Sequence, residues 1–313
     1  MFSDWGKLKA SGVLGLNARN GDYIMRLNPR RNYPLVDDKV LCKKVLLEHG
    51  MQAPELIGVI TRTGDSEKLS EILRGEQQFV IKPANGSGGD GILVIVGVVN
   101  DLYRSVDGRL FDGGNVAHHL TNVISGLYSL GGQPDYAMLE ALVKFDPVFD
   151  QIAFQGVPDI RVIVFQGVPV MSMVRLPTRL SHGKANLHQG AIGAGIALCT
   201  GQTTGGVLGN HRVTEHIDTG ASIVGFTIPH WQKILEMSAR CYEAVGLGYL
   251  GVDVVLDRER GPLILELNAR PGLNIQIANR TGLRQRMERV EAAGVKDAPA
   301  EERASWACSH FKR

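Results

Sequence analysis

A glycine-rich segment between two apolar runs is the feature that most limits what this chain can fold into. It extends from Lys82 to Gly91 and joins the apolar runs 79–81 and 92–99. Short apolar runs bounded by turn residues are typical of buried strands. Its glycines let backbone N–H groups approach an anion without obstruction by side chains. These glycines are Gly86, Gly88, Gly89 and Gly91. The segment therefore predicts a strand–loop–strand unit that binds phosphate, with Lys82 supplying a positive charge.

The order of residues separates this segment from two other phosphate-binding loops. Lys82 precedes the glycines, whereas the lysine of the G-x-x-x-x-G-K-[ST] loop follows them. The G-x-G-x-x-G loop opens a helix, but the run after Gly91 has the pattern of a strand. A glycine-rich hairpin that binds no ligand is the alternative interpretation.

Composition and charge exclude several classes of protein. Glycine accounts for 38 of 313 residues, about 12%, against roughly 7% in average chains. A formal net charge of +2 gives no general electrostatic case for binding nucleic acid or an anionic membrane. The four cysteines are far apart and lack C-x-x-C spacing, so we predict neither a zinc site nor a disulfide framework. The run 92–99 is far shorter than the ~20 residues that cross a bilayer. We therefore expect a cytoplasmic protein without membrane insertion.

Hydrophobic patterning predicts a mixed α+β chain. Residues up to Pro34, rich in arginine, are expected to form an irregular arm, and residues beyond Val290 a surface helix or frayed end. Asp37 is the expected N-cap of the helix that follows the arm, and Gly50 its stop. The expected helices are 38–49, 117–130 and 229–245. The expected hairpins are 160–165 with 168–175 and 251–257 with 262–268, and a polar loop is expected at 180–195.

The second hairpin places acidic side chains opposite one another. If residues 258–261 form a four-residue loop, Asp257 faces Pro262 and Asp253 faces Glu266, with Asn268 on the same face of the sheet. Two opposed carboxylates are destabilising unless a positive charge lies between them. Oxygen ligands of this kind suit Mg²⁺. The alternative is that Asp253 caps a turn and Glu266 pairs with a lysine or arginine.

A set of cations and amides is the third candidate for chemistry. Arg161 and Arg175 are expected near opposite ends of the first hairpin, and Arg270 should project to the same side as Asn268. The full set is Arg161, Arg175, Lys184, Asn186, His188 and Arg270. Ordinary solvated surface residues are the alternative.

Taken together, five motifs resemble the ATP-grasp superfamily. They are 82–91, 139–143, 159–161, 185–188, and the pair 251–253 with 265–272. Within the superfamily the chain is similar to alpha-L-glutamate ligases that modify a ribosomal protein or a cofactor, specifically to an uncharacterised alpha-L-glutamate ligase-related branch. The resemblance covers about residues 37–282. It implies an α+β ATP-grasp fold with two lobes and ATP between them.

The resemblance also implies roles for individual residues. Lys39 and Lys82 would contact the nucleotide phosphates, with Lys184 as a further contact. A loop made of Gly86, Ser87, Gly88, Gly89 and Gly91 would close over them. The adenine would be read by backbone groups of Glu140, Ala141, Leu142 and Val143, where side-chain identity matters less. Asp253, Glu266 and Asn268 fall on the magnesium ligands. Phosphate or substrate carboxylate would be contacted by Arg161, Arg175, Asn186 and Arg270.

The expected organisation is an arm (1–36), an N-terminal lobe with the glycine-rich loop (37–139), a C-terminal lobe with the metal site (140–290) and a tail (291–313). ATP-grasp enzymes generally carry a further α/β domain before these lobes. With only about 36 residues before the first matching helix, we expect this domain to be largely absent here. We expect the arginine-rich arm, a second copy of the chain or a partner subunit to replace it.

The expected activity is ATP-dependent carboxylate–amine ligation through an acyl phosphate, with ATP and Mg²⁺, or Mn²⁺ in its place. The partners would be a small molecule or peptide with a carboxylate, and an amine donor such as glutamate; no nucleic acid is expected. A non-catalytic ATP-binding regulatory or scaffold module is the alternative. Phosphotransfer to a small molecule is a third interpretation.

Overall fold

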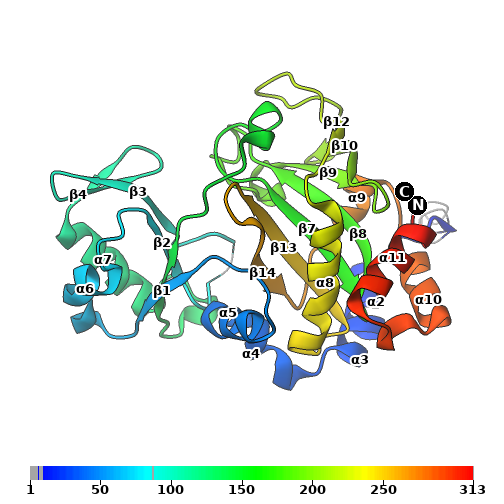
Figure 1. The fold of residues 1–313 in the computed structure, drawn as a ribbon, viewed down its shortest axis with the longest axis horizontal. Helices are drawn as coiled ribbons and strands as arrows, with labels where there is room; N and C mark the ends of the chain where they lie inside the picture. Colours follow the sequence, from blue (N-terminus) through cyan, green and yellow to red (C-terminus); the bar gives the residue numbers. More distant parts are fainter. Residues whose placement is uncertain (1–5, 7–9, 87, 313) are drawn as a thin grey trace. The chain divides into compact units, whose positions relative to one another are not determined.

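A computed structural model of the chain describes residues 6, 10–86 and 88–312. The chain divides into two compact units. The first unit comprises residues 1–36, 48–52 and 145–313, and the second comprises residues 37–47 and 53–144. Both units combine an antiparallel sheet with helices, as the predicted α+β fold implies (Figure 1).

The second unit is built on a six-stranded sheet in the order β1-β6-β2-β3-β4-β5. Its strands are β1 (Leu56–Ile60), β2 (Phe79–Pro83), β3 (Leu93–Val99), β4 (Leu102–Ser105), β5 (Leu110–Phe111) and β6 (Ala137–Ala141). Its α-helices are α5 (Lys39–Glu48), α6 (Leu69–Leu73) and α7 (Gly113–Ile124), with 3-10 turns η3 (Thr63–Lys68) and η4 (Leu130–Gly132).

Alternation along β2 separates the core of this unit from its polar face. Phe79 and Ile81 are fully buried and pack in one cluster with Leu120 of α7 and Leu73 of α6. Successive side chains of a strand point to opposite faces, so Lys82 lies on the other face. Val40 of α5 packs near that face against Ala84 and Met138. One face thus carries the apolar core, and the other carries the charged groups.

The first unit is built on an eight-stranded sheet. Seven strands follow the order β11-β10-β9-β8-β7-β13-β14, and β12 pairs with β10. The strands are β7 (Asp159–Phe165), β8 (Val168–Leu176), β9 (Ile192–Ile196), β10 (Gln202–Leu208), β11 (His211–Val213), β12 (Val224–Thr227), β13 (Tyr249–Asp257) and β14 (Gly261–Asn268). The central strands β7, β8 and β13 are almost wholly buried because helices cover both faces.

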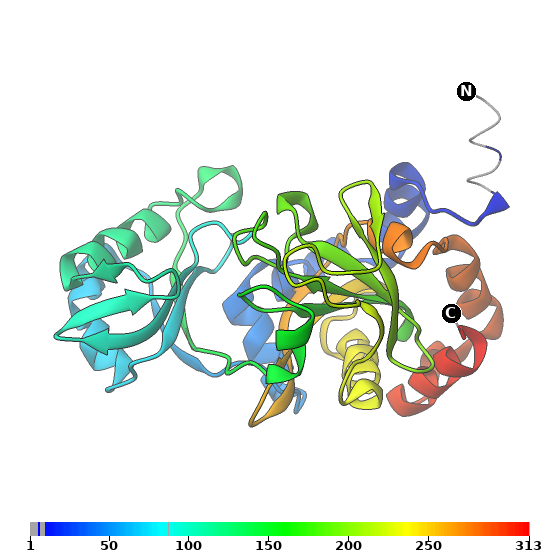
Figure 2. The same cartoon turned by 90° about the horizontal axis from the view of Figure 1, so that it is seen from above.

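Helices lie on both faces of this sheet. Figure 2 shows α8 (Trp231–Val245) and α11 (Ala300–His310) on one side, and α9 (Ile275–Asn279) with the helices of the arm on the other. The remaining helices are α2 (Leu16–Ala18), α3 (Met25–Leu27), α4 (Pro34–Asp37) and α10 (Arg284–Ala293). Single turns are η1 (Arg19–Ile24), η2 (Arg30–Asn32), η5 (Pro147–Gln151), η6 (Leu187–Gln189) and η7 (Val295–Asp297). Across the described ranges, no helix is long and apolar enough to span a membrane.

The arm differs from the sequence-based expectation, whereas the tail contains a helix, one of its two expected forms. The arm is mostly helical and includes a π-helix, η1, which is a rare element. It is fixed by tertiary contacts: the Asn28 side chain bonds the backbone of Tyr249 and Ala269. The tail is anchored by Arg303, whose side chain is 2% exposed and donates to the carbonyl of Gly167. Neither contact leaves a periodic signal in the sequence.

Two predicted helices have wrong boundaries for local reasons. Asp38, not Asp37, caps α5, because its carboxylate accepts from the N–H groups of Val40 and Leu41. Asp37 ends the short helix α4. The helix α7 begins four residues earlier than expected because Asp112 and Asn115 form a reciprocal capping box. It ends at Ile124 rather than at residue 130, because Gly126 follows with a positive φ of 85°.

Candidate active site

A buried cluster of one carboxylate and two lysines occupies the polar face of the second unit. Glu140 on β6 is 1% exposed and forms ion pairs with Lys82 of β2 and Lys43 of α5. The Lys43 Nζ–Glu140 Oε2 distance is 2.6 Å, and Lys43 also donates to the carbonyl of Pro54. Lys82 and Glu140 share one face of the sheet because Lys82 pairs with Met138 and Glu140 with Val80.

The cluster carries one more positive than negative charge. Burial alone would raise the pKa of Glu140, but the ammonium groups of Lys82 and Lys43 outweigh burial and lower it. Burial lowers the pKa of Lys43, and Glu140 opposes that effect. Glu140 is therefore ionised at neutral pH. One lysine is enough to neutralise it, so the second leaves a net positive charge in the cluster. Such a surplus suits a phosphate group.

Contacts with Asp135 and Lys39 fix the first residues of the glycine-rich loop. At its start the Asp135 carboxylate accepts from the backbone and side chain of Asn85. Lys39 donates through Nζ to the carbonyl of Gly86, and its N–H bonds the carbonyl of Ala84 at 3.1 Å. Lys39 thus lies at the loop, as its predicted role requires.

Among the described glycines of the loop, Gly88 and Gly89 are open around their backbone. A Cβ atom added at Gly88 or Gly89 would meet nothing within 4 Å, and both residues have positive φ, of 71° and 82°. At Gly91 an added Cβ would lie 2.5 Å from the ring of Tyr128. Glycine is therefore required for packing at Gly91 and for backbone conformation at Gly88 and Gly89. Ser87, a predicted loop contact, lies outside the described residues.

The predicted adenine-binding segment includes the end of β6. The N–H of Ala141 donates to the carbonyl of Glu55 at 2.9 Å, so it is occupied within the unit. Leu142 and Val143 follow the end of the strand. Side-chain identity was expected to matter little here, but Glu140 is the counter-ion of two lysines.

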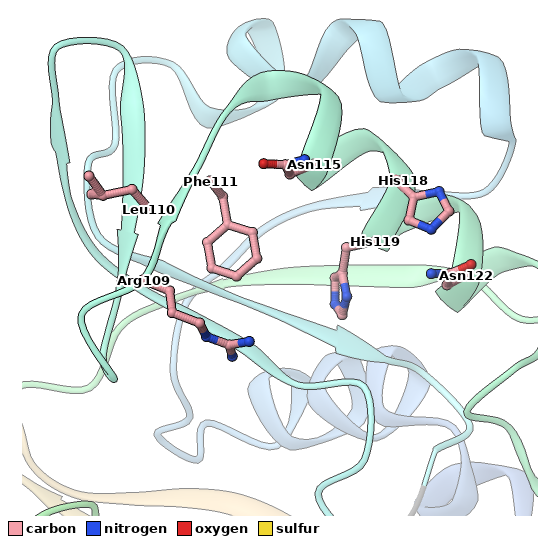
Figure 3. Close-up of a pocket in the computed structure, with 7 residues that line it drawn as sticks. All are labelled: Arg109, Leu110, Phe111, Asn115, His118, His119 and Asn122. Carbon is pink, nitrogen blue, oxygen red and sulfur yellow. The ribbon is translucent and has the colours of Figure 1, made fainter.

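A separate open pocket of about 480 Å³ lies between β5 and α7 (Figure 3). Its lining residues are Arg109, Leu110, Phe111, Asn115, His118, His119 and Asn122. None of the predicted site residues lines it. One lining residue reaches the glycine-rich loop, because His119 Nε2 lies 3.1 Å from the carbonyl oxygen of Gly91. Burial lowers the pKa of His119.

In the first unit, the two predicted metal carboxylates face each other as expected. Asp253 pairs with Glu266 and Gly251 with Asn268 across β13 and β14. The route to this register differs from the prediction. Asp257 pairs with Gly261 rather than Pro262, and a β-bulge between Asp253 and Val254 restores the predicted pairing. A bulge inserts one extra residue in one strand, so it compensates for the shorter turn.

Two arginines hold Asp253 in place. Arg161 bonds both of its carboxylate oxygens, at 2.6 and 2.5 Å, and Arg175 Nη2 bonds Oδ2 at 2.9 Å. Arg175 is also bound through two nitrogens to Asp159. The prediction that Arg161 and Arg175 lie near opposite ends of the hairpin is wrong. Antiparallel pairing brings the start of β7 beside the end of β8, where Asp159 pairs with Arg175.

The pKa values of the two carboxylates in this network are shifted in opposite directions. Burial opposes ionisation of Asp253, but Arg161 and Arg175 outweigh it and hold its pKa at about 2. Asp159 is also buried and has Arg175 as its main counter-ion, with the Asp253 charge nearby, so burial raises its pKa to about 6. Both carboxylates are therefore ionised at neutral pH, and Asp253 keeps its charge to a much lower pH than Asp159 does.

The donor set is consistent with a magnesium ion shared with phosphate. Asn268 donates through Nδ2 to Asp253 at 3.3 Å, which leaves its amide oxygen for another partner. No group of three or more His, Cys, Asp or Glu residues in the described ranges could hold a metal by itself. Mg²⁺ commonly uses one or two protein carboxylates together with waters and substrate phosphates. Glu266 and Asn268 fit that pattern, and Asp253 fits it as an anchor held by arginines.

The remaining predicted residues lie in the same unit and have other contacts there. Lys184 is exposed in a turn, and its N–H bonds the carbonyl of Ser181. Asn186 caps η6 by accepting from the N–H of His188. Arg270 lies over the ring of Tyr33, 4.7 Å from its centroid. Their roles toward a ligand remain predictions.

Sequence reasoning missed three charged residues that organise these clusters: Lys43, Asp135 and Asp159. Asp159 had a signal, because it begins the strand that contains Arg161 and faces Arg175 in any tight hairpin. The only signal for Lys43 was its position one helical turn after Lys39 on the same helix. Asp135 is remote in sequence from the loop it fixes.

Comparison with known proteins assigns the sequence to a family. Residues 18–292 match the sequence model of the family described as "Sugar-transfer associated ATP-grasp". The match supports the ATP-grasp superfamily, and it does not support the narrower relation to glutamate ligases. No curated protein matches the chain significantly.

Three of the solved structures similar to the chain share 12–15% sequence identity with it. The ATP-grasp ligase PsnB with a minimal precursor shares 12% identity over 86% of this chain and 63% of its own, with a TM-score of 0.47. D-alanine–D-alanine ligase from Bacillus anthracis with ATP shares 15% over 90% and 67%, with a TM-score of 0.43. D-cycloserine synthetase DcsG shares 12% over 91% and 74%, with a TM-score of 0.45. The chain thus spans less than two thirds of the length of PsnB.

Proposed function

Because the chain belongs to the sugar-transfer associated ATP-grasp family, we propose that it is an ATP-dependent ligase that joins a carboxylate to an amine. A substrate carboxylate attacks the γ-phosphate of ATP and ADP leaves, which gives an acyl phosphate. An amine then attacks the acyl carbon, loses a proton and displaces inorganic phosphate, which leaves an amide.

One observation carries the proposal beyond the family assignment: each unit of an ATP-grasp chain holds a charge surplus that suits one part of Mg-ATP. The cluster of Lys82, Lys43 and Glu140 has a positive surplus. The network of Asp159, Asp253, Arg161 and Arg175 is balanced, and Glu266, opposite Asp253, adds a negative charge. The first suits phosphate and the second a divalent cation.

The residues of the chain act mainly by holding charge in position. Lys82 and Lys39 would neutralise the phosphates beneath the open backbone of Gly88 and Gly89. Arg161 and Arg175 keep Asp253 ionised and fixed. Bound magnesium would stabilise negative charge on the transferring phosphoryl group. Preorganised charges of this kind need no rearrangement during the reaction.

The test is phosphate release by the purified chain with ATP and Mg²⁺, screened against amino acids, short acidic peptides and uronic acids. Uronic acids are included because of the family description. Mass spectrometry should detect a new amide, which distinguishes ligation from phosphotransfer. Glu266→Gln should lower the rate by ~10²-fold or more, about 3 kcal/mol, while the protein stays folded.

Glu259→Gln is the matched control, since it removes an exposed carboxylate from the turn of the same hairpin. It should keep the wild-type rate. Equal rates in Glu266→Gln and wild type would remove the metal assignment. Tight ATP binding without phosphate release in the presence of every acceptor would favour a regulatory or scaffold module instead.

A further inference from the structure

The three residues that follow the last predicted metal ligand are held by the N-terminal arm. They form the segment 269–271. Asn28 donates through Nδ2 to the carbonyl of the first residue at 3.1 Å, and Arg19 donates through Nη1 to the carbonyl of the third at 2.8 Å. The second residue, Arg270, places its guanidinium carbon 4.7 Å from the centroid of the Tyr33 ring. Three side chains of the arm therefore contact three consecutive residues directly after the predicted metal ligand.

The arm is itself bound to the sheet and to a neighbouring helix, so it offers a fixed support. Asn28 accepts from the N–H of Tyr249 at 2.9 Å and donates to its carbonyl at 2.7 Å. Gln276 of α9 bonds both backbone groups of Leu14, at 2.8 and 3.0 Å. Figure 2 shows the helices of the arm on the same side of the sheet as α9. A side chain of the arm can therefore hold another residue in position.

The segment 269–271 also packs on the hairpin that carries the predicted metal ligands. A Cβ atom added at Gly251 would lie 2.7 Å from Cβ of Pro271, so Pro271 lies directly against β13. Gly251 pairs with Asn268 across the hairpin. Within the segment Ala269 and Pro271 are buried, whereas Arg270 is exposed. The segment thus has a fixed backbone and presents one cation at the surface of the unit.

A ring beneath a guanidinium changes how that guanidinium meets a ligand. The positive charge is attracted to the face of an aromatic ring within about 6 Å of the centroid. Arginine has a long side chain, and ordering it when a ligand binds lowers the affinity. The Tyr33 ring restricts the Arg270 side chain before any ligand arrives. Stacking occupies the flat face of the guanidinium and not its N–H edge, which is the part that binds carboxylate or phosphate oxygens.

We propose that Tyr33 is a positioning residue whose ring holds Arg270 in the orientation that binds an oxyanion of the reactants, the substrate carboxylate or the γ-phosphate of ATP. The assignment of that oxyanion to a reactant rests on the proposed ligase function. The positioning rests on the contacts between the arm and segment 269–271. The arm acts on the reaction through Arg270 and contributes none of the predicted metal ligands.

Nuclear magnetic resonance of the Arg270 side chain in the full chain tests the positioning without ATP or an acceptor. The Nε–Hε signal of Arg270 is identified by its absence in Arg270→Lys. Its order parameter should be high in wild type and in Tyr33→Phe, which keeps the ring. It should decrease in Tyr33→Met, which keeps an apolar side chain without a ring face. An order parameter that is unchanged in Tyr33→Met would overturn the inference.

Kinetics test the consequence of the positioning once an acceptor is found. Arg270→Ala should raise the KM of one reactant about 10- to 100-fold. A rise for the carboxylate substrate assigns the oxyanion to that carboxylate, and a rise for ATP assigns it to the γ-phosphate. Tyr33→Met should raise the same KM about 3- to 10-fold and leave kcat near wild type, while Tyr33→Phe should keep the wild-type KM. Wild-type values of both KM in Arg270→Ala would overturn the inference.

A double-mutant cycle separates positioning from packing. In the Arg270→Ala background, Tyr33→Met should have no further effect on KM, because the ring acts only through that arginine. Full additivity of the two changes would overturn the inference and assign Tyr33 to packing of the arm. A KM raised as much in Tyr33→Phe as in Tyr33→Met would overturn it as well, because the ring would then not be what positions the arginine.

Phe111→Met is the matched control, since it removes a ring beneath Arg109 in the second unit, where the guanidinium carbon lies 5.4 Å from the centroid. It should keep every KM at the wild-type value. Absence of phosphate release from wild type would overturn the proposed ligase function. The order parameter of Arg270 would still decide whether Tyr33 positions it, so the two failures are distinguishable.

Discussion

Each unit buries a cluster in which carboxylates are paired with cations, but the cations differ between the two units. In the second unit one carboxylate, Glu140, faces two lysines. In the first unit two carboxylates, Asp159 and Asp253, face two arginines. Lysine is a compact point charge on a flexible stem, whereas arginine is a planar fork that binds carboxylates through two nitrogens. The lysine cluster suits a charge that must change partners, and the arginine network suits a carboxylate that must stay fixed.

Among the variants that test this comparison, Glu140→Ala is expected to have the largest effect on stability. It leaves Lys43 and Lys82 close together without a buried counter-ion and should lower the unfolding free energy by ~3–5 kcal/mol. Urea denaturation, with hydrogen exchange of β2 and β6, measures the loss. Glu71→Ala, an exposed site on α6, is the control. If both variants were equally stable, the lysine cluster would contribute nothing to the fold.

Asp159→Asn tests the arginine network through pH. Burial raises the pKa of Asp159 to about 6 in the folded protein, from an ordinary value of 3.8. The folded state therefore binds the proton more tightly, and this group's contribution to stability decreases as pH rises from about 4 to above 6. The change is on the order of 3 kcal/mol.

Asparagine is neutral at every pH in this range. The difference in unfolding free energy between wild type and Asp159→Asn should therefore change by about 3 kcal/mol between pH 4 and pH 7. Urea denaturation across this range measures it, and exposed Asp150→Asn should show no comparable change. A pH-independent difference would mean that Asp159 stays ionised, like Asp253, and that the two carboxylates are equivalent.

The variant Lys43→Met tests whether Lys82 leaves Glu140 to bind a phosphate of ATP. Without Lys43, movement of Lys82 to a phosphate would leave Glu140 buried and unpaired, so Lys82 should stay with Glu140. We expect ATP binding to weaken ~10- to 50-fold, about 1.4–2.3 kcal/mol. The double variant Lys43→Met with Glu140→Gln should recover affinity, because the glutamine does not hold Lys82. Calorimetry with a non-hydrolysable ATP analogue checks both, and no recovery would assign Lys43 to packing alone.

Arg175→Lys should have the smallest effect and sharpens the contrast between the side-chain types. Lysine keeps the charge but cannot bond Asp159 and Asp253 as the fork does. We expect a loss of about 1 kcal/mol, which lowers the melting temperature by roughly 2–4 °C. Exposed Arg212→Lys is the control. A wild-type melting temperature would show that charge alone maintains the network.

Much of the fold could be predicted because its signals are local. The runs around the glycine-rich loop became β2 and β3, and the turn at Gln166 and Gly167 joins β7 to β8 with positive φ at both residues. The pairing of Asp253 with Glu266 was also correct, although the predicted turn was one residue too long. The error was hidden because the bulge shifts the register back by one.

The rest depended on contacts between distant residues. Lys43 and Glu140 are 97 positions apart, and Arg161 and Asp253 are 92 apart. The arginines were expected to face a ligand, yet they are bound to Asp159 and Asp253. Periodicity states which face a residue occupies, and it does not state which charge lies opposite on another element.

The sequence by itself determined the strands, the glycine-rich loop and the opposition of two carboxylates, because these follow from the two-residue alternation of strands and the freedom of glycine. Only the tertiary structure decided the ion partners of those carboxylates and the helical form of the arm. Burial is the reason, since a charge or hydroxyl removed from water must find its partner wherever the chain brings one.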